Sequence, residues 1–253
     1  MKIFNFIFTL FFIMACSVNV SAHVPPKLIR EFKKVVKVIA VSKDETGMVI
    51  ATGFPINPSE IMTAGHFCAS VVDGVKSGVI KEQMSIQFLN NNDEIELKLV
   101  KEILKVEFST TQDLCIISVP KHGLVPVKIS LEKVKFGDLI YASGVPQGEF
   151  PIITEGYVSQ PINEGDGPDD LTDGKMLLSI SAAVGSSGSP VFNIKGEVIG
   201  VIVLVNSKYD QISYAVTGLN IWRFILAWLW GIFFRIYPHI LNNLSTEMGY
   251  NCE

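Results

Sequence analysis

The stretch AVGSSGSPVF, residues 183–192, decides how this chain folds. Glycines on both sides of Ser187 let the backbone turn sharply, and they would aim the N–H groups of Gly185 and Ser187 at one point. A Gly-Ser run is also typical of a flexible linker. A linker, however, would not continue through Pro190 into the apolar run at residues 198–205. The pattern therefore predicts a tight loop between two strands that presents Ser187 as a nucleophile.

Short β-branched runs separated by Gly, Pro, Asn and Asp extend over most of the chain. They lie at residues 35–41, 48–54, 85–89, 96–100, 114–119, 138–142, 152–159, 176–181, 197–205 and 211–216. Many short strands at this spacing, with no helical period between them, indicate an all-β sandwich or barrel. The acidic segment at residues 161–175 lacks the ligand spacing of a calcium loop, so we interpret it as a solvated surface loop.

Two further segments carry residues that fit the chemistry of an activated serine. TAGH, residues 63–66, ends in His66, and imidazole is the side-chain base whose ordinary pKa lies closest to neutrality. QDLCII, residues 112–117, places Asp113 directly before an apolar strand, where its carboxylate can accept the Nδ1–H of a histidine. Alone, His66 would more often be structural and Asp113 a turn residue. The order His, Asp, Ser along one chain favours the functional interpretation.

These three segments resemble the signature segments of the trypsin-like (chymotrypsin-fold) serine peptidases. The nearest branches are the disulfide-poor bacterial ones, the Deg-type proteases and the glutamyl endopeptidases. GDLIYASGVP at residues 137–146 and TEGYVS at residues 154–159 also resemble the opening strands of that family's second barrel. The resemblance covers roughly residues 35–218.

The resemblance implies two antiparallel six-stranded β-barrels with the active site in the cleft between them. It also implies a role for each site residue: His66 as general base, Asp113 as orienting carboxylate and Ser187 as nucleophile, with Gly185 and Ser187 as the oxyanion hole. By the same analogy, Ser181, Leu204, Val205 and Ser213 would surround the specificity pocket. Because Ser181 is not an acid and Val205 is bulky, we expect small or medium apolar side chains there, and neither Lys nor Arg.

Ser186 departs from many relatives, which have Asn or Asp at that position. An uncharged residue cannot pair with a newly cut N-terminus, so we expect no activation of the digestive zymogen kind. The chain is also too short after the peptidase region for a PDZ domain, so a full Deg-type chaperone-protease is not expected.

Charge and chemistry limit the partners that we expect. The 253-residue chain has a net charge of −4, whereas nucleic-acid binding usually needs a basic face. The triad chemistry needs no metal or organic cofactor. We therefore expect a protein or peptide substrate, no nucleic acid, no metal and no cofactor.

Residues 1–22 have the features of a signal peptide: Lys2, an apolar run and small residues before Ala22. The apolar run is shorter than the about 20 residues of a spanning helix. The alternatives to a cleaved signal are an uncleaved anchor, a buried helix and lipid attachment at Cys16. We expect an extracytoplasmic peptidase domain at residues 23–218, with barrels at about residues 35–125 and 126–218. Residues 219–253 would form a hydrophobic helix and tail.

The mature chain would keep an odd number of cysteines, which cannot all pair within one molecule. Their spacing matches neither a disulfide framework nor a zinc site. We therefore expect Cys68 and Cys115 to be buried free thiols, and the state of Cys252 stays open.

Residues 219–237 are aromatic and aliphatic, with three tryptophans and no charge between Arg223 and Arg235. This segment could associate with a membrane, with the arginines snorkelling and the tryptophans at the interface. It could also be a terminal helix that packs on the barrel or forms oligomers. Two alternatives to an active endopeptidase stay open: an inactive protease-fold binding protein, and a structural membrane protein whose β-domain displays loops.

Overall fold

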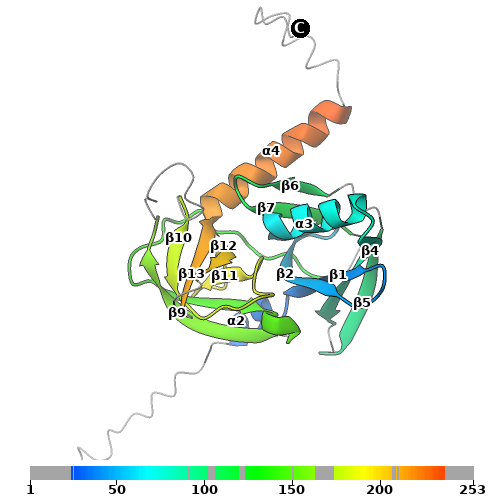
Figure 1. Ribbon diagram of the computed structural model, residues 1–253. Coiled ribbons are helices and arrows are strands. Elements are labelled where there is room, and N and C mark those ends of the chain that lie inside the picture. The colour runs from blue at the N-terminus through cyan, green and yellow to red at the C-terminus, as the bar shows by residue number, and fades with distance from the viewer. Residues whose placement is uncertain are drawn as a thin grey trace, which may run out of the picture.

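The computed structural model of this chain describes residues 24, 26–90, 92–101, 106–119, 123–149, 151–162, 174–206, 209 and 211–236. The predicted signal peptide, Cys16 and Cys252 lie outside the described residues, as do the centre of the acidic loop and the tail after residue 236. The described residues form two β-lobes side by side, with one helix leaving the body at the top (Figure 1).

The N-terminal lobe is a seven-stranded antiparallel sheet with a helix packed against it. Its strands follow the order β5-β4-β1-β2-β3-β7-β6 across the sheet. Helix α2 (Pro26–Phe32) precedes the lobe, whose elements are β1 (Val36–Ser42), β2 (Met48–Asn57), β3 (Glu60–Ala64), α3 (Gly65–Lys76), β4 (Ile80–Leu89), β5 (Ile95–Lys101), β6 (Glu107–Ser109) and β7 (Leu114–Ser118). Alternate residues of β1 are buried, as expected for a strand with one face on the core.

The C-terminal lobe is a closed six-stranded barrel in the order β10-β13-β12-β11-β8-β9, with β9 also paired to β10. Its elements are β8 (Leu139–Gly144), the 3₁₀ turn η2 (Pro146–Gly148), β9 (Ile152–Gln160), β10 (Met176–Ser179), β11 (Pro190–Asn193), β12 (Val198–Val205), β13 (Ile212–Thr217) and helix α4 (Gly218–Ile236). Closure leaves no unpaired edge among the described strands of this lobe.

The prediction of two six-stranded barrels is thus confirmed for the C-terminal lobe only. Among the described residues, the N-terminal strands follow an open order and do not close. The expectation that no helix lies between the strands is wrong, because α3 connects β3 to β4. In α3 the buried residues after Gly65 are Phe67, Cys68, Val71, Val72 and Val75, which share one face of a helix.

The expectation of free thiols at Cys68 and Cys115 is also wrong. These residues form a disulfide with a Cα–Cα distance of 6.4 Å and a sequence separation of 47. The bond is possible because α3 packs across β7, which brings two positions distant in sequence within bridging range. Spacing along the chain could not show this proximity.

A shared apolar core joins the two lobes. It contains Phe32 of α2, Phe54 of β2, Tyr141 of β8 and Phe192 of β11. The ring of Phe32 lies 5.6 Å from that of Tyr141 and 5.4 Å from that of Phe192, measured between centroids. Each fully buried side chain of this size contributes about 1.5–3 kcal/mol. The core therefore fixes how the lobes meet, and the functional site lies at this junction.

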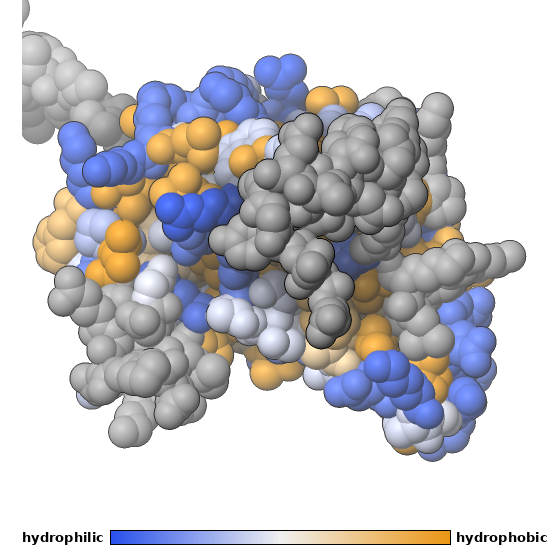
Figure 2. All heavy atoms as spheres, turned by 90° about the horizontal axis from the view of Figure 1, so that it is seen from above, coloured by the Kyte–Doolittle hydropathy of each residue, from blue (hydrophilic) through white to orange (hydrophobic). Residues whose placement is uncertain are grey.

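Helix α4 packs its first turns on β12 and β13 and then projects past the body (Figure 1). Ile221, Phe224 and Ile225 are buried against the barrel, whereas Leu226 and Trp230 are exposed. Seen from above, apolar and hydrophilic residues are intermixed on the surface of the described part of the chain (Figure 2). Within the described part of the chain, no helix has the length and apolar character needed to cross a membrane.

Candidate active site

Ser187 lies in the segment between β10 and β11, where two glycines adopt left-handed backbone conformations. Gly185 has φ +95° and Gly188 has φ +88°, which residues with a Cβ rarely adopt. A Cβ at Gly188 would lie 2.0 Å from the carbonyl oxygen of Thr52, and one at Gly185 would lie 2.5 Å from that of Val145. Both positions therefore require glycine, for conformation and for space.

His66 is the second residue of α3, and Asp113 directly precedes β7. The sheet brings them together, because β3 leads into α3 and pairs with β7. The Nδ1 atom of His66 lies 3.0 Å from both carboxylate oxygens of Asp113, and the N–H of His66 donates to Oδ1 at 2.8 Å. On the other side of the ring, Nε2 lies 3.1 Å from Oγ of Ser187. The three residues form one hydrogen-bonded chain.

The backbone holds Asp113 in an unfavourable conformation. Its φ is +53°, in a region that costs a residue other than glycine about 1–3 kcal/mol. A Cβ on Gly65 would lie 2.8 Å from the nitrogen of Leu114, so the start of α3 packs directly on this turn. The side chain of Asp113 is 14% exposed and that of His66 is 48% exposed. A largely buried carboxylate thus faces a half-exposed ring.

Every carbonyl of residues 184–187 accepts a hydrogen bond. The pairs are Val184 with the N–H of Gln147 (2.6 Å), Gly185 with the hydroxyl of Thr52 (2.8 Å), Ser186 with the N–H of Ser189 (2.9 Å) and Ser187 with the N–H of Thr52 (2.9 Å). Because a peptide unit is planar and trans, fixing a carbonyl also fixes the N–H of the next residue, which points the opposite way.

The anchored loop leaves two donors available. The N–H of Ser186 donates to the carbonyl of Ala183, and that of Gly188 donates to the carbonyl of Ile202. Among the described residues, the N–H groups of Gly185 and Ser187 have no hydrogen-bond partner. Two fixed and unsatisfied N–H groups beside a serine are suited to binding an oxygen that carries negative charge.

Thr52 of β2 connects the lobes at the site, and the sequence pattern did not identify it. Its side chain is buried, and its hydroxyl donates to Gly185 while accepting from the N–H of Val145 at 3.0 Å. Its carbonyl accepts from the hydroxyl of Thr63 at 2.6 Å. The sequence offered one signal, a threonine next to Gly53 in a strand, which is too common to interpret.

The residues predicted to surround a specificity pocket lie at one end of the barrel. Ser181 is exposed just after β10, and Leu204 and Val205 are partly exposed at the end of β12. Val205 pairs in register with Ser213. Ser213 itself is buried, and its hydroxyl donates to the carbonyl of Ile180 at 3.3 Å. The hydroxyl of Ser213 is thus engaged within the barrel.

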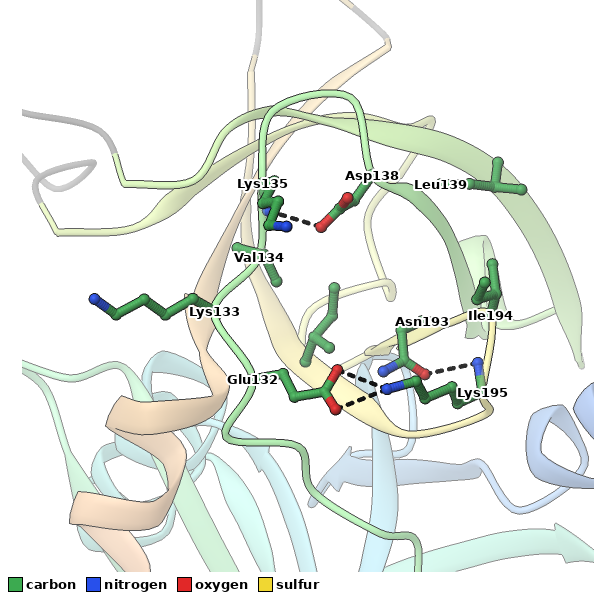
Figure 3. Close-up of a pocket in the computed structure, with 10 residues that line it drawn as sticks. Glu132, Lys133, Val134, Lys135, Asp138, Leu139, Asn193, Ile194 and Lys195 are labelled. Atoms are coloured by element: carbon green, nitrogen blue, oxygen red, sulfur yellow. Dashed lines mark hydrogen bonds and ion pairs between the residues drawn. The ribbon is translucent and has the colours of Figure 1, made fainter.

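A hollow of about 320 Å³ lies elsewhere on the C-terminal lobe, beside the turn between β11 and β12 (Figure 3). Lys195 pairs with Glu132 at 2.7 Å there, and the N–H of Lys135 donates to Asp138 at 2.7 Å. None of the three hydrogen-bonded site residues lines it. Because its two carboxylates, Glu132 and Asp138, already accept hydrogen bonds from residues that line the hollow, we assign no ligand to it. Nor does any group of three or more potential metal ligands occur in the described part of the chain.

The sequence profile of the trypsin-like peptidase domain matches residues 51–201, more than half of the chain. The chain belongs to this family. The matched part of the trypsin-like domain extends from β2 into β12 and includes His66, Asp113 and Ser187.

Curated relatives of the domain carry the name "Probable periplasmic serine endoprotease DegP-like". The one from Pseudomonas putida is 31% identical over 133 residues, which are 52% of this chain and 25% of that protein. The one from Rhizobium meliloti is 34% identical over 118 residues, which are 45% of this chain and 21% of that protein. The chain thus spans about a quarter or less of the length of these relatives.

Solved structures share the fold of the trypsin-like domain. The active form of the Rv3671c protease from M. tuberculosis is 20% identical with a TM-score of 0.59, and the match covers 76% of this chain and 79% of that one. Deg5 is 20% identical with a TM-score of 0.58, and the match covers 78% and 90%. At this identity the likeness establishes the fold alone.

Proposed function

We propose that the chain is a serine endopeptidase that hydrolyses peptide bonds through an acyl-enzyme on Ser187. The observation that carries the proposal is the hydrogen-bonded series Ser187, His66, Asp113, with distances of 3.1 Å and 3.0 Å. In the first step, Oγ of Ser187 attacks the substrate carbonyl while its proton passes to Nε2 of His66. Asp113 accepts the Nδ1–H bond, which fixes the tautomer and stabilises the imidazolium.

The imidazolium then gives its proton to the leaving amine, and the acyl-enzyme forms. Water attacks this ester while His66 takes its proton, and the imidazolium then returns the proton to Oγ of Ser187 as the C–O bond breaks and the acid product leaves. The tetrahedral oxyanion of each step would accept hydrogen bonds from the N–H groups of Gly185 and Ser187. Removal of one such donor typically costs about 10²–10³ in turnover.

A fluorophosphonate probe tests this proposal, because it labels only an activated serine. Wild type should be labelled under native conditions, and Ser187→Ala should not. Ser189→Ala is the matched control, since the Ser189 hydroxyl is buried without a hydrogen-bond partner and should not be needed. Absence of labelling in folded wild type would mean a protease fold without peptidase chemistry. Labelling of Ser187→Ala would mean that another serine attacks.

For specificity we propose a pocket between Ser181 and the end of β12 that accepts small or medium apolar side chains. The support is the uncharged Ser181 and the partly exposed Leu204 and Val205. Profiling of cleavage in a peptide library tests this. Strong cleavage after Arg or Glu would exclude it.

We also propose that the protein acts outside the cytoplasm. The Cys68–Cys115 disulfide supports this, because such bonds persist in oxidising compartments. The curated relatives are called periplasmic. Cell fractionation with an antibody against the chain is the direct measurement, and a purely cytoplasmic location would contradict the proposal.

The exposed face of α4 is suited to an anionic lipid surface. Leu219, Leu226 and Trp230 are each about half exposed, and Arg223 lies on the same face. The helix carries no Asp or Glu. We therefore propose that α4 rests on the membrane surface with its apolar side chains in the interface.

Sedimentation with phosphatidylglycerol vesicles tests this role of α4. Leu226→Glu combined with Trp230→Glu should abolish co-sedimentation without touching the buried face of the helix. Leu97→Glu is the control, because Leu97 is equally exposed, on β5, and should leave binding unchanged. Equal binding of the wild type and the α4 variant would refute the proposal.

A further inference from the structure

The disulfide joins the same two segments of the chain as the hydrogen bonds between His66 and Asp113. Cys68 follows His66 by two residues on α3, and Cys115 follows Asp113 by two residues on β7. The separation along the chain is 47 residues for both the hydrogen-bonded pair and the disulfide. The covalent bond therefore joins α3 to β7 at positions two residues beyond the hydrogen-bonded pair.

The hydrogen bonds between these elements depend on a single carboxylate. Both the N–H and the Nδ1 of His66 contact Asp113. The residue before α3, Ala64, provides no side-chain cap for the helix. A movement of α3 relative to β7 would thus break every polar contact of the imidazole with Asp113 at once.

Packing does little to hold the ring by itself. The side chain of His66 is 48% exposed, and Asp113 has a left-handed backbone that its surroundings must enforce. By contrast, Cys68 and Cys115 are 1% and 0% exposed, within the core of the N-terminal lobe. The disulfide is therefore the rigid part of this junction, and the His66–Asp113 pair is the part that needs support.

We infer that the Cys68–Cys115 disulfide positions His66 against Asp113, so that full peptidase activity requires the oxidised bond. The inference rests on the proposed function. Exchange with a dithiol reductant would break the S–S bond, leave two thiols on the protein and convert the reductant to its disulfide. α3 would then move relative to β7, and the imidazole would lose its fixed tautomer and direction.

The test compares oxidised wild type with Cys68→Ala/Cys115→Ala by proton NMR and by kinetics. Oxidised wild type should show a downfield Nδ1–H resonance, assigned by its absence in His66→Gln. The double variant should lose or broaden this resonance. Its kcat on a peptide substrate should fall about 10- to 100-fold, the range for a small misplacement of a catalytic group. KM should change less than about twofold, because the substrate contacts stay intact.

Val71→Ala is the matched control, because Val71 is buried in the same core and on the same helix. It should lower the melting temperature yet keep both the resonance and kcat at temperatures where the protein is folded. If the double variant does not fold, wild type treated with a dithiol replaces it. The extent of reduction is then measured by mass spectrometry after alkylation in denaturant.

The two proposals fail differently. An Nδ1–H resonance that depends on the disulfide, in a protein that fluorophosphonate does not label, would support the positioning role and refute the peptidase. An unchanged resonance and an unchanged kcat in the double variant would refute the positioning role and leave the peptidase intact.

Discussion

Thr52→Val tests how the loop that carries Ser187 is held. Valine keeps the shape of the buried side chain and both backbone hydrogen bonds, but it removes the hydroxyl that bridges Gly185 and Val145. The N–H of buried Val145 would be left unsatisfied, at a cost of about 1–3 kcal/mol. Loss of the bond to Gly185 adds about 1 kcal/mol. We therefore expect the free energy of unfolding, measured in urea, to fall by about 2–4 kcal/mol.

Activity should fall as well, because the carbonyl of Gly185, in the loop that carries Ser187, is no longer fixed. Both proposed oxyanion donors remain in Thr52→Val, so the loss should be smaller than the about 10²-fold that follows removal of a donor. We expect kcat and kcat/KM to fall together by about tenfold, the sign of an interaction made in the transition state.

Ser143→Ala is the control for Thr52→Val. The Ser143 hydroxyl is also buried and donates to the carbonyl of Phe32 at 2.9 Å, so its hydrogen bond does not involve residues 184–187. This variant should lose stability and keep kcat within about twofold. If Thr52→Val loses the expected stability but keeps the kcat of wild type, the anchoring of Gly185 does not support catalysis.

Three other expectations concern stability. Replacing both cysteines of the disulfide by alanine should lower the free energy of unfolding by about 4 kcal/mol, because the bond closes a loop over 47 residues and so reduces the chain entropy of the unfolded state. Urea denaturation measures this change, and a value below about 1 kcal/mol would contradict the entropy argument. Gly188→Ala should lower the free energy of unfolding more than Gly137→Ala in the same assay. Both glycines have positive φ, but only a Cβ at residue 188 would meet backbone atoms. Equal losses of stability would show that space is not limiting at Gly188. Lys128 donates a hydrogen bond that lowers the pKa of Glu197. This pair therefore stabilises the fold at pH values above the ordinary pKa of the carboxyl. The stabilisation is lost as the pH falls through the lowered pKa of Glu197. The difference in melting temperature between wild type and Lys128→Met should therefore shrink on acidification below about pH 4, and a constant difference would exclude the pair.

The strands and the three site residues could be predicted because their signals are local. Each of the ten β-branched runs corresponds to a strand of the structure, with shifts of a few residues at the ends. The resemblance of their three short segments to a known family implied that His66, Asp113 and Ser187 meet, and the structure brings them within hydrogen-bond distance. The strands β3, β6 and β11 were missed, because they are only three to five residues long and carry little pattern.

The helix α3 and the disulfide could not be predicted in the same way. Helix α3 contains Gly74 and the β-branched pair Val71 and Val72, all with low helix propensity, and its stability comes from burial of one face. The proximity of Cys68 and Cys115 results from tertiary packing, but the sequence held one indirect signal of it. Once His66 and Asp113 are taken to be in contact, the segments that carry the two cysteines are brought close together, which makes a bond between them possible.

The site depends on the junction of the lobes more than on either lobe alone. His66 and Asp113 belong to the N-terminal sheet, whereas Ser187 belongs to the closed barrel, and Thr52 of β2 binds the Ser187 loop from across the junction. Both hydrogen bonds from Thr52 therefore act between lobes, so a movement of one lobe would change the Ser187–His66 distance and the direction of the N–H groups together. This coupling explains why a buried threonine distant from the triad in sequence should affect turnover and stability at once.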